Sequence, residues 1–280
     1  MTLAIDAHQH LWVYDPREYA WIDDMMASLR RDFLPAELRQ RLESNGFQGS
    51  IVVQARQTLE ETRWLLELAE SNPVILGVVG WVDLRSTRLR AELESFSRNP
   101  RLVGVRHIVQ DEPDDFLLQP DFLRGISILE EFDLAYDILI YTKHLRIASE
   151  FVKRFPRQRF VLDHLSKPPI KNSGFDAWAS GIRELASYPN LYAKVSGLVT
   201  EADWRFWTPE HIRPYFDEAF KCFGPGRVMF GSDWPVCTVA GTYERVAGLV
   251  RDYVSGYSLA ERQAVLGGNA AQFYRLKLDR

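Results

Sequence analysis

Residues 3–10 read Leu-Ala-Ile-Asp-Ala-His-Gln-His, an apolar run that ends in two histidines separated by one residue. In a β-strand, the side chains of residues i and i+2 point to the same face. His8 and His10 are therefore expected to leave the end of one strand side by side, where they can hold a metal ion or bind one oxyanion together. Two histidines on an exposed surface are the ordinary alternative. The position of the pair at a strand end, with matching groups later in the chain, favours a functional role.

Seven more short apolar or β-branched runs follow the first one at intervals of roughly 20 to 50 residues, which is the spacing of βα units. Some of them, such as Ile51-Val52-Val53, are wholly apolar, as expected of parallel strands that are buried on both faces. Together with the first run, the predicted strands cover residues 3–8, 50–55, 74–82, 102–108, 135–140, 160–164, 191–195 and 228–231.

Helical patterns fill the intervals between these strands. The pair Thr208-Pro209 is a strong start signal, because an N-cap residue precedes a proline at the first helical position. The predicted helices cover residues 59–71, 87–97, 118–132, 145–155, 177–187, 208–223, 242–255 and 259–266.

Eight alternating units in 280 residues predict an α/β protein with a closed (β/α)8 barrel of the TIM type. An open doubly wound sheet is disfavoured, because its first strand is usually followed by a glycine-rich turn and here it is followed by His-Gln-His. No break in composition, low-complexity tract or internal repeat divides the chain, so residues 1–280 are expected to form one domain. The segment 11–35, rich in Trp, Tyr, Asp and Met, is long for a loop after a barrel strand. We expect it to form a lid over a pocket.

The composition bears on the partners and the location, and it favours the cytoplasm. The formal net charge is −4 and the basic residues are scattered, so nucleic acid is not an expected partner. No stretch approaches the roughly 18 uninterrupted apolar residues of a membrane span, and the N-terminus lacks the pattern of a signal peptide. Cys222 and Cys237 do not form a disulfide framework and are expected to be free thiols. The sequence leaves the oligomeric state open.

Four polar side chains at strand ends are the candidate catalytic residues: His8, His10, His164 and Asp233. His164 ends the predicted sixth strand and Asp233 follows the eighth. Strand ends converge on one pocket in a barrel, so these groups are expected to meet. A buried core histidine and a helix N-cap are the structural alternatives for His164 and Asp233, and their joint placement disfavours both. Three imidazoles and one carboxylate suit a single divalent ion, zinc above all.

Aromatic and polar residues near the same strand ends are candidate substrate-binding groups. Aromatic rings can stack on the apolar face of a small molecule while polar groups fix its orientation. Each tryptophan is equally well explained by core packing, Arg106 by a structural salt bridge and Lys167 by a role in shaping a turn. The candidates are Trp12, Trp21, Arg106, His107, Gln110, Tyr141, Lys167 and Trp234.

A set of ordered motifs spans nearly the whole chain. They are Asp-Ala-His-Gln-His-Leu-Trp at 6–12, Tyr-Ala-Trp-Ile at 19–22, Gly-Val-Arg-His at 104–107, Asp-His-Leu-Ser-Lys-Pro at 163–168, Lys-Val-Ser-Gly-Leu-Val-Thr-Glu-Ala-Asp-Trp at 194–204 and Phe-Gly-Ser-Asp-Trp-Pro-Val at 230–236. This set resembles the amidohydrolase superfamily, and within it the sugar-lactone hydrolases of the L-fuconolactonase and L-rhamnonolactonase type. Ser166 stands where this family usually has glycine.

The resemblance implies hydrolysis of a neutral sugar lactone, with a 6-deoxy sugar acid as the specific expectation and the identity of the sugar left open. The three histidines would bind the carbonyl oxygen, directly or through one metal ion, and stabilise the oxyanion. Asp233 would accept a proton from the attacking water and return it to the leaving ring oxygen.

Two departures from the wider superfamily bear on the metal. Binuclear members carry a bridging lysine at the end of the fourth strand and histidines on the fifth and sixth. Here the fourth strand ends in Arg106-His107, and the fifth is followed by Tyr141-Thr142-Lys143-His144. We therefore expect at most one divalent ion, with zinc as the expected metal. The site can also work without an ion, since this branch includes enzymes that need no metal. A metal-dependent decarboxylase on the same barrel and a non-catalytic binding protein are the alternative functions.

Overall fold

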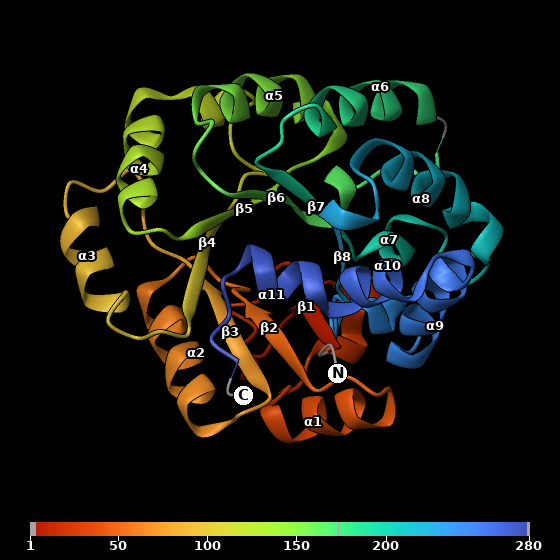
Figure 1. Cartoon of the computed structure of the whole chain (residues 1–280). Coiled ribbons are helices and arrows are strands. Elements are labelled where there is room, and N and C mark those ends of the chain that lie inside the picture. Colours follow the sequence, from red (N-terminus) through yellow and green to blue (C-terminus); the bar gives the residue numbers. More distant parts are fainter. Residues whose placement is uncertain (1–3, 173, 279–280) are drawn as a thin grey trace.

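Eight parallel strands form the barrel in a computed structural model, which describes residues 4–172 and 174–278. The strands lie side by side in the order of the chain (Figure 1). They are β1 (Ile5–Gln9), β2 (Gly49–Val53), β3 (Ile75–Gly80), β4 (Leu102–Ile108), β5 (Ala135–Leu139), β6 (Phe160–Leu162), β7 (Leu191–Val195) and β8 (Val228–Phe230). The ring is completed where the Asp233 amide donates to the His8 carbonyl at 2.8 Å and the His10 amide donates to the Trp234 carbonyl at 2.7 Å. The predicted (β/α)8 barrel and its eight strands are confirmed.

The longer helices surround the strands as an outer ring, and the short helix α11 lies across one end of the barrel (Figure 1). Helix α8 begins at the predicted Thr208-Pro209 signal, and the Thr58 hydroxyl caps α2 by accepting from the Glu61 amide at 3.1 Å. Three helices, α1, α7 and α11, were not predicted. The helices are α1 (Pro35–Ser44), α2 (Leu59–Ser71), α3 (Leu89–Phe96), α4 (Pro120–Glu131), α5 (Leu145–Arg154), α6 (Phe175–Ala186), α7 (Leu198–Glu201), α8 (Pro209–Phe223), α9 (Tyr243–Tyr253), α10 (Leu259–Gln263) and α11 (Asn269–Phe273).

The barrel interior is apolar at one end and polar at the other. The apolar end is a buried cluster of strand side chains, which includes Val53, Val161 and Met229, and residues of α11 such as Phe273 pack against it. Buried charged groups occupy the other end, at the carboxyl ends of the strands: Arg106 on β4, Asp137 on β5 and Lys194 on β7 are all almost fully buried. This division leaves the polar end for the site, as is usual for such barrels.

One extra residue in β1 turns both histidines toward the polar end. Asp6 pairs with Ser50 and Gln9 pairs with Val52, so β1 advances three residues while β2 advances two. Ile5 and Ala7 pack in the apolar interior, and strict alternation would point His8 away from it. The bulge corrects this, as bulges beside active sites often do.

The segment between β1 and α1 forms a loop whose two ends pair with each other. The Trp12 amide donates to the Phe33 carbonyl at 3.0 Å, and the Phe33 amide donates to the Trp12 carbonyl at 2.9 Å. Its middle contains a 3-10 helix at Asp24–Leu29. Trp12 is buried, whereas Trp21 remains 44% exposed.

The state of the cysteines and the character of the helices can be compared with the expectations from the composition. Cys222 and Cys237 are both free thiols. Among the residues that the structure describes, no helix combines the length and the apolar character needed to cross a bilayer.

Two helical glycines test how tightly the outer ring is packed. A Cβ on Gly125 in α4 would lie 2.0 Å from the Leu84 carbonyl oxygen, whereas a Cβ on Gly248 in α9 would meet no atom within 4 Å. We expect Gly125→Ala to lower the free energy of unfolding by about 1–3 kcal/mol through overpacking. Gly248→Ala is the matched control and should raise it by about 0.5–1 kcal/mol, because alanine favours a helix over glycine. Urea unfolding followed by circular dichroism measures both. Equal effects of the two substitutions would contradict this packing.

Candidate active site

A cavity of about 360 Å³ opens at the carboxyl ends of the strands. Three candidate catalytic residues line it: His10, His164 and Asp233. Six candidate substrate-binding residues also line it: Trp12, Trp21, Arg106, Gln110, Tyr141 and Lys167. His8 is fully buried directly beside this group. The structure therefore brings together in one place residues that are up to 225 positions apart in the chain.

Two of the candidate substrate-binding residues, His107 and Trp234, lie away from the cavity wall. His107 is stacked on Phe116 with ring centroids 4.7 Å apart, and its Nε2 is 2.9 Å from a Glu112 carboxylate oxygen. Trp234 is buried and packs edge-on against Phe33. The residue before each of them reaches the cavity instead: Arg106 precedes His107, and Asp233 precedes Trp234.

His8, His10 and Asp233 form a compact group. The two histidine Nε2 atoms are 3.2 Å apart, as expected for side chains on the same face of one strand end. The Asp233 Oδ1 lies 3.4 Å from the His10 Nε2 and 3.8 Å from the His8 Nε2. The Nδ1 of His10 lies 2.8 Å from the Val53 carbonyl, which can only accept. His10 therefore carries its proton on Nδ1, and its Nε2 lone pair faces the group.

His164 reaches the cavity from a left-handed turn, not from the strand itself. We predicted that it ends the sixth strand, but β6 ends at Leu162, and the four residues from His164 to Lys167 all have positive φ, at 53°, 49°, 62° and 49°. Non-glycine residues adopt this conformation at a cost of roughly 1–2 kcal/mol each. The third of them is Ser166, where the family usually has a glycine that would relieve part of this cost.

Neighbouring side chains hold this turn in place. The Trp178 indole donates to the Leu165 carbonyl at 2.7 Å, and the Thr142 hydroxyl lies 3.2 Å from both the Ser166 and the Lys167 carbonyl oxygens. On the ring side, the Ser196 hydroxyl is 2.9 Å from the His164 Nδ1. The turn thus directs His164 and Lys167 into the same cavity.

Gly197 makes room for this arrangement. Its φ is 65°, and a Cβ at this position would lie 2.5 Å from the His164 Nδ1 and 3.1 Å from an Asp233 carboxylate oxygen. Only glycine lets the backbone between β7 and α7 pass so close to both residues.

A fully buried charge network lies beneath the histidines. The Lys194 ammonium is 2.5 Å from the Asp137 carboxylate, 3.0 Å from the Asp163 carboxylate and 3.2 Å from the His8 Nδ1. The Tyr274 hydroxyl donates to both Asp137 oxygens, at 2.9 and 2.8 Å. Sequence analysis gave no role to Lys194, Asp137 or Asp163, because each is a single charged residue inside an apolar strand or at its end.

Arg106 belongs to the same network. Its guanidinium lies 3.1 Å from the second Asp163 oxygen and 3.3 Å from the His8 Nε2, and it also donates to the Gln54 carbonyl. The structural alternative raised for Arg106 is thus present in the structure, although the side chain also lines the cavity. Asp163 neutralises much of the charge that Arg106 would offer to a ligand.

The environment disfavours the charged forms of His8 and His164 and favours the ionised form of Asp233. Burial lowers the pKa of His164 to about 4, against the opposing effect of Asp233. Burial likewise holds the pKa of His8 well below its usual value, although Asp163 opposes it. Burial would raise the pKa of Asp233, but the neighbouring His164, His10 and His8 outweigh it and hold this pKa well below the usual range. Near neutral pH Asp233 is therefore a carboxylate beside the neutral imidazoles of His8 and His164.

The group of His8, His10 and Asp233 fits a zinc ion. Zinc bonds of 2.0–2.2 Å in a tetrahedral site place neighbouring ligand atoms about 3.3 Å apart, close to the 3.2, 3.4 and 3.8 Å found here. The His164 Nε2 is 3.9 Å from the Asp233 Oδ1 and completes the predicted set. Nitrogen and carboxylate donors with an open cavity on one side are the usual surroundings of such an ion.

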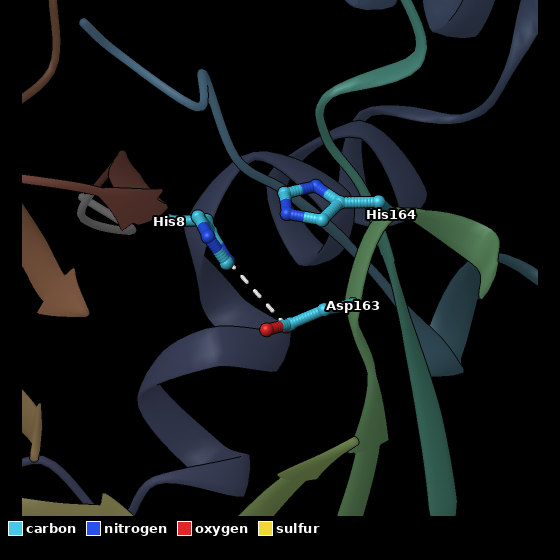
Figure 2. A group of neighbouring side chains, drawn as sticks. All are labelled: His8, Asp163 and His164. Carbon is cyan, nitrogen blue, oxygen red and sulfur yellow. Dashed lines mark ion pairs between the residues drawn. The ribbon is translucent and has the colours of Figure 1, made fainter. Parts of the chain in front are cut away.

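A second group of possible ligands is less suitable for a cation. Figure 2 shows His8 facing Asp163, with the ring of His164 next to them; the two oxygens of Asp163 are the acceptors for Lys194 and Arg106. A metal ion bound to Asp163 would lie close to both of these positive charges. We therefore assign any metal to His8, His10 and Asp233.

Comparison with known proteins establishes the family. The amidohydrolase family model matches residues 5–276. The chain belongs to this family. An L-fucono-1,5-lactonase of Burkholderia multivorans is 43% identical to this amidohydrolase, and the match covers 98% of this chain and 97% of the relative. An L-fucono-1,5-lactonase of Burkholderia ambifaria is 38% identical over 99% and 97%. The crystal structure of a Burkholderia multivorans amidohydrolase with bound zinc matches with a TM-score of 0.95 and 42% identity, covering 98% of this chain and 99% of the other.

The buried network should dominate the stability of this amidohydrolase. Lys194→Met leaves two buried carboxylates without their shared cation, so we expect the free energy of unfolding to fall by about 3–5 kcal/mol. Adding Asp137→Asn removes one of the two carboxylates and should restore part of the loss. Lys171→Met is the control, because the Lys171 side chain is 64% exposed and its ammonium is 3.9 Å from Asp203; a change within about 0.5 kcal/mol is expected. A similarly small effect of Lys194→Met in urea unfolding would contradict the assignment.

Proposed function

We propose that this amidohydrolase opens the ring of a sugar lactone by hydrolysis, with an L-fucono- or L-rhamnono-lactone as the expected substrate. The observation that carries the proposal is the ionised Asp233 in the wall of the cavity, 3.9 Å from the neutral imidazole of His164. The Burkholderia L-fucono-1,5-lactonases, which align over nearly their full length, support the choice of substrate.

The residues divide the work of ester hydrolysis between them. Asp233 accepts a proton from the attacking water and returns it to the ring oxygen that leaves. His164 lines the same space, and its Nε2 can donate to the carbonyl oxygen on which negative charge develops. The Nε2 lone pair of His10 can bind a metal ion instead. His8 holds the imidazole of His10 in place, since the two Nε2 atoms are 3.2 Å apart. A zinc ion held by His8, His10 and Asp233 would polarise the carbonyl when bound.

The cavity suits a neutral ring that carries hydroxyl groups. Trp12, Trp21 and Trp204 supply aromatic surface in its wall, and Gln110 and Tyr141 supply hydrogen-bonding groups. A dicarboxylate substrate would call for free arginines, whereas Arg106 already pairs with Asp163 at 3.1 Å. These features favour a sugar lactone over an acidic one.

We further propose that residues 1–280 act as one domain in which the segment 11–35 serves as a lid. Trp21 and Met26 of this segment line the cavity, and Glu18 forms an ion pair of 2.6 Å with Arg56, which follows β2. A contact of this kind can hold the segment over the cavity once substrate is bound. The two free cysteines agree with a reducing compartment, and we propose the cytoplasm as the location.

Replacing the proposed base tests the reaction. Asp233→Asn keeps the shape of the side chain but cannot accept the proton, so we expect kcat for L-fucono-1,5-lactone to fall about 10²–10⁴-fold. A pH-indicator assay with freshly prepared lactone measures the acid released, corrected for spontaneous opening. Asp176→Asn, an exposed change at the start of α6, serves as the control. Turnover of Asp233→Asn near that of the control would exclude Asp233 as the base.

Metal binding is tested separately from turnover. We expect the wild-type protein to bind about one zinc ion per chain in equilibrium dialysis, and His10→Ala to weaken binding by tenfold or more, because it removes one of the ligands. His211→Gln is the control, since His211 is exposed at the start of α8. Unchanged zinc binding by His10→Ala would contradict the assigned ligands. Activity before and after chelation then shows whether the ion is required.

The same lactone assay separates the alternative functions. A metal-dependent decarboxylase would release carbon dioxide from an aromatic acid and leave every sugar lactone intact. A binding protein without catalysis would bind the lactone and leave the rate of ring opening unchanged, with or without its histidines.

A further inference from the structure

Two charged side chains in the cavity wall have no part in the chemistry described above. The Lys167 ammonium lies 3.3 Å from a Glu201 carboxylate oxygen, and both residues line the cavity that contains His164 and Asp233. Their side chains are 24% and 23% exposed, so they are neither surface charges nor sealed in the core. Within the described residues, each finds its only ion-pair partner in the other.

The backbone fixes both members of this pair. Lys167 is the last residue of the left-handed turn that also places His164, with a φ of 49°. Glu201 ends the short helix α7, and its carbonyl accepts from the Lys171 amide at 3.1 Å, which ties α7 to the chain that follows the turn. The pair therefore has a set position relative to His164.

An aromatic ring lines the same cavity as this pair. The Trp204 indole donates to the Thr200 carbonyl at 2.8 Å, which fixes the orientation of the ring. A tryptophan and an ion pair in one cavity wall can accommodate a sugar ring, because the C–H face can stack while the hydroxyls reach the charged groups.

The charges of the pair indicate what it binds. A hydroxyl group both donates and accepts, so two adjacent hydroxyls can donate to Glu201 and accept from Lys167 at the same time. A carboxylate would be attracted by Lys167 but repelled by Glu201. Burial raises the pKa of Glu201 above its usual value, although Lys167 opposes this shift.

We propose that the Lys167–Glu201 pair binds two adjacent hydroxyl groups of the lactone ring and so determines the specificity for neutral, hydroxylated lactones. This inference rests on the proposed lactonase function and adds the subsite that recognises the ring. Lys167 and Glu201 are binding residues in this account, and Asp233 remains the group that moves the proton.

The test compares two six-membered lactones that share the ester but differ in the hydroxyls. L-Fucono-1,5-lactone carries the adjacent hydroxyls, and δ-valerolactone carries none. We expect Glu201→Gln and Lys167→Met each to lower kcat/KM for L-fucono-1,5-lactone about 10–100-fold, mainly through KM, because a hydrogen bond to a charged group is lost. The value for δ-valerolactone should stay within about threefold of wild type.

Control variants and a folding check accompany this comparison. Glu131→Gln breaks an exposed ion pair with Arg90 on the outer ring and should leave both lactones unaffected. Melting temperatures identify any variant that has lost its fold, and the conservative Glu201→Asp should retain more discrimination than Glu201→Gln. An equal fall for both lactones would overturn the inference and place Glu201 in the chemistry. An unchanged kcat/KM for L-fucono-1,5-lactone would overturn it as well.

Binding of free L-fucose separates this inference from the proposed function. L-Fucose has the adjacent ring hydroxyls but no ester, so saturation-transfer NMR reports on recognition alone. If the wild-type protein binds L-fucose but opens no lactone, and Glu201→Gln abolishes this binding, the result would support the subsite and reject the lactonase function. If the wild-type protein opens the lactone, and neither Glu201→Gln nor Lys167→Met changes L-fucose binding, the result would retain the function and reject the subsite.

Discussion

The site depends on the interaction of the Lys194 ammonium with its buried neighbours. This ammonium lies in the barrel interior within 3.2 Å of Asp137, Asp163 and the His8 ring, with no exposed surface. Isolated charges at such depth would be very costly, so each must be matched by its neighbours. Asp137 lies on β5, Lys194 lies on β7 and Asp163 directly follows β6. The network therefore fixes the relative height of three strands, and with it the position of His8 above them.

Local backbone strain then directs the reacting groups into the cavity. His164 and Asp233 both have positive φ, at 53° and 58°, and the bulge in β1 turns His8 and His10 toward the same space. Residues held in such conformations persist only where the surroundings determine them, as the Trp178 and Thr142 hydrogen bonds do for the turn after β6. The fold thus accepts a cost in stability in exchange for convergence of the polar groups.

The sequence predicted the strands well because a parallel strand buried on both faces is a short apolar run, which can be recognised without knowledge of its neighbours. The histidine pair and Asp233 were found for a similar reason, since they directly follow such runs. Lys194 and Asp137 were missed because a lone charge inside an apolar run is unremarkable until its partners on adjacent strands are known. His107 and Arg106 are consecutive, and periodicity alone did not show which of them faces the cavity.

Charge compensation links the stability of the barrel to its choice of ligand. Arg106 and Lys167 are the cations in the cavity wall, and each is paired, with Asp163 at 3.1 Å and with Glu201 at 3.3 Å. A wall whose positive groups are each paired with a carboxylate offers donors and acceptors without a strong net attraction for anions. Such a surface favours hydroxyl groups over carboxylates before the reaction. In the proposed reaction, the new carboxylate meets the ionised Asp233, and this repulsion favours release of the product.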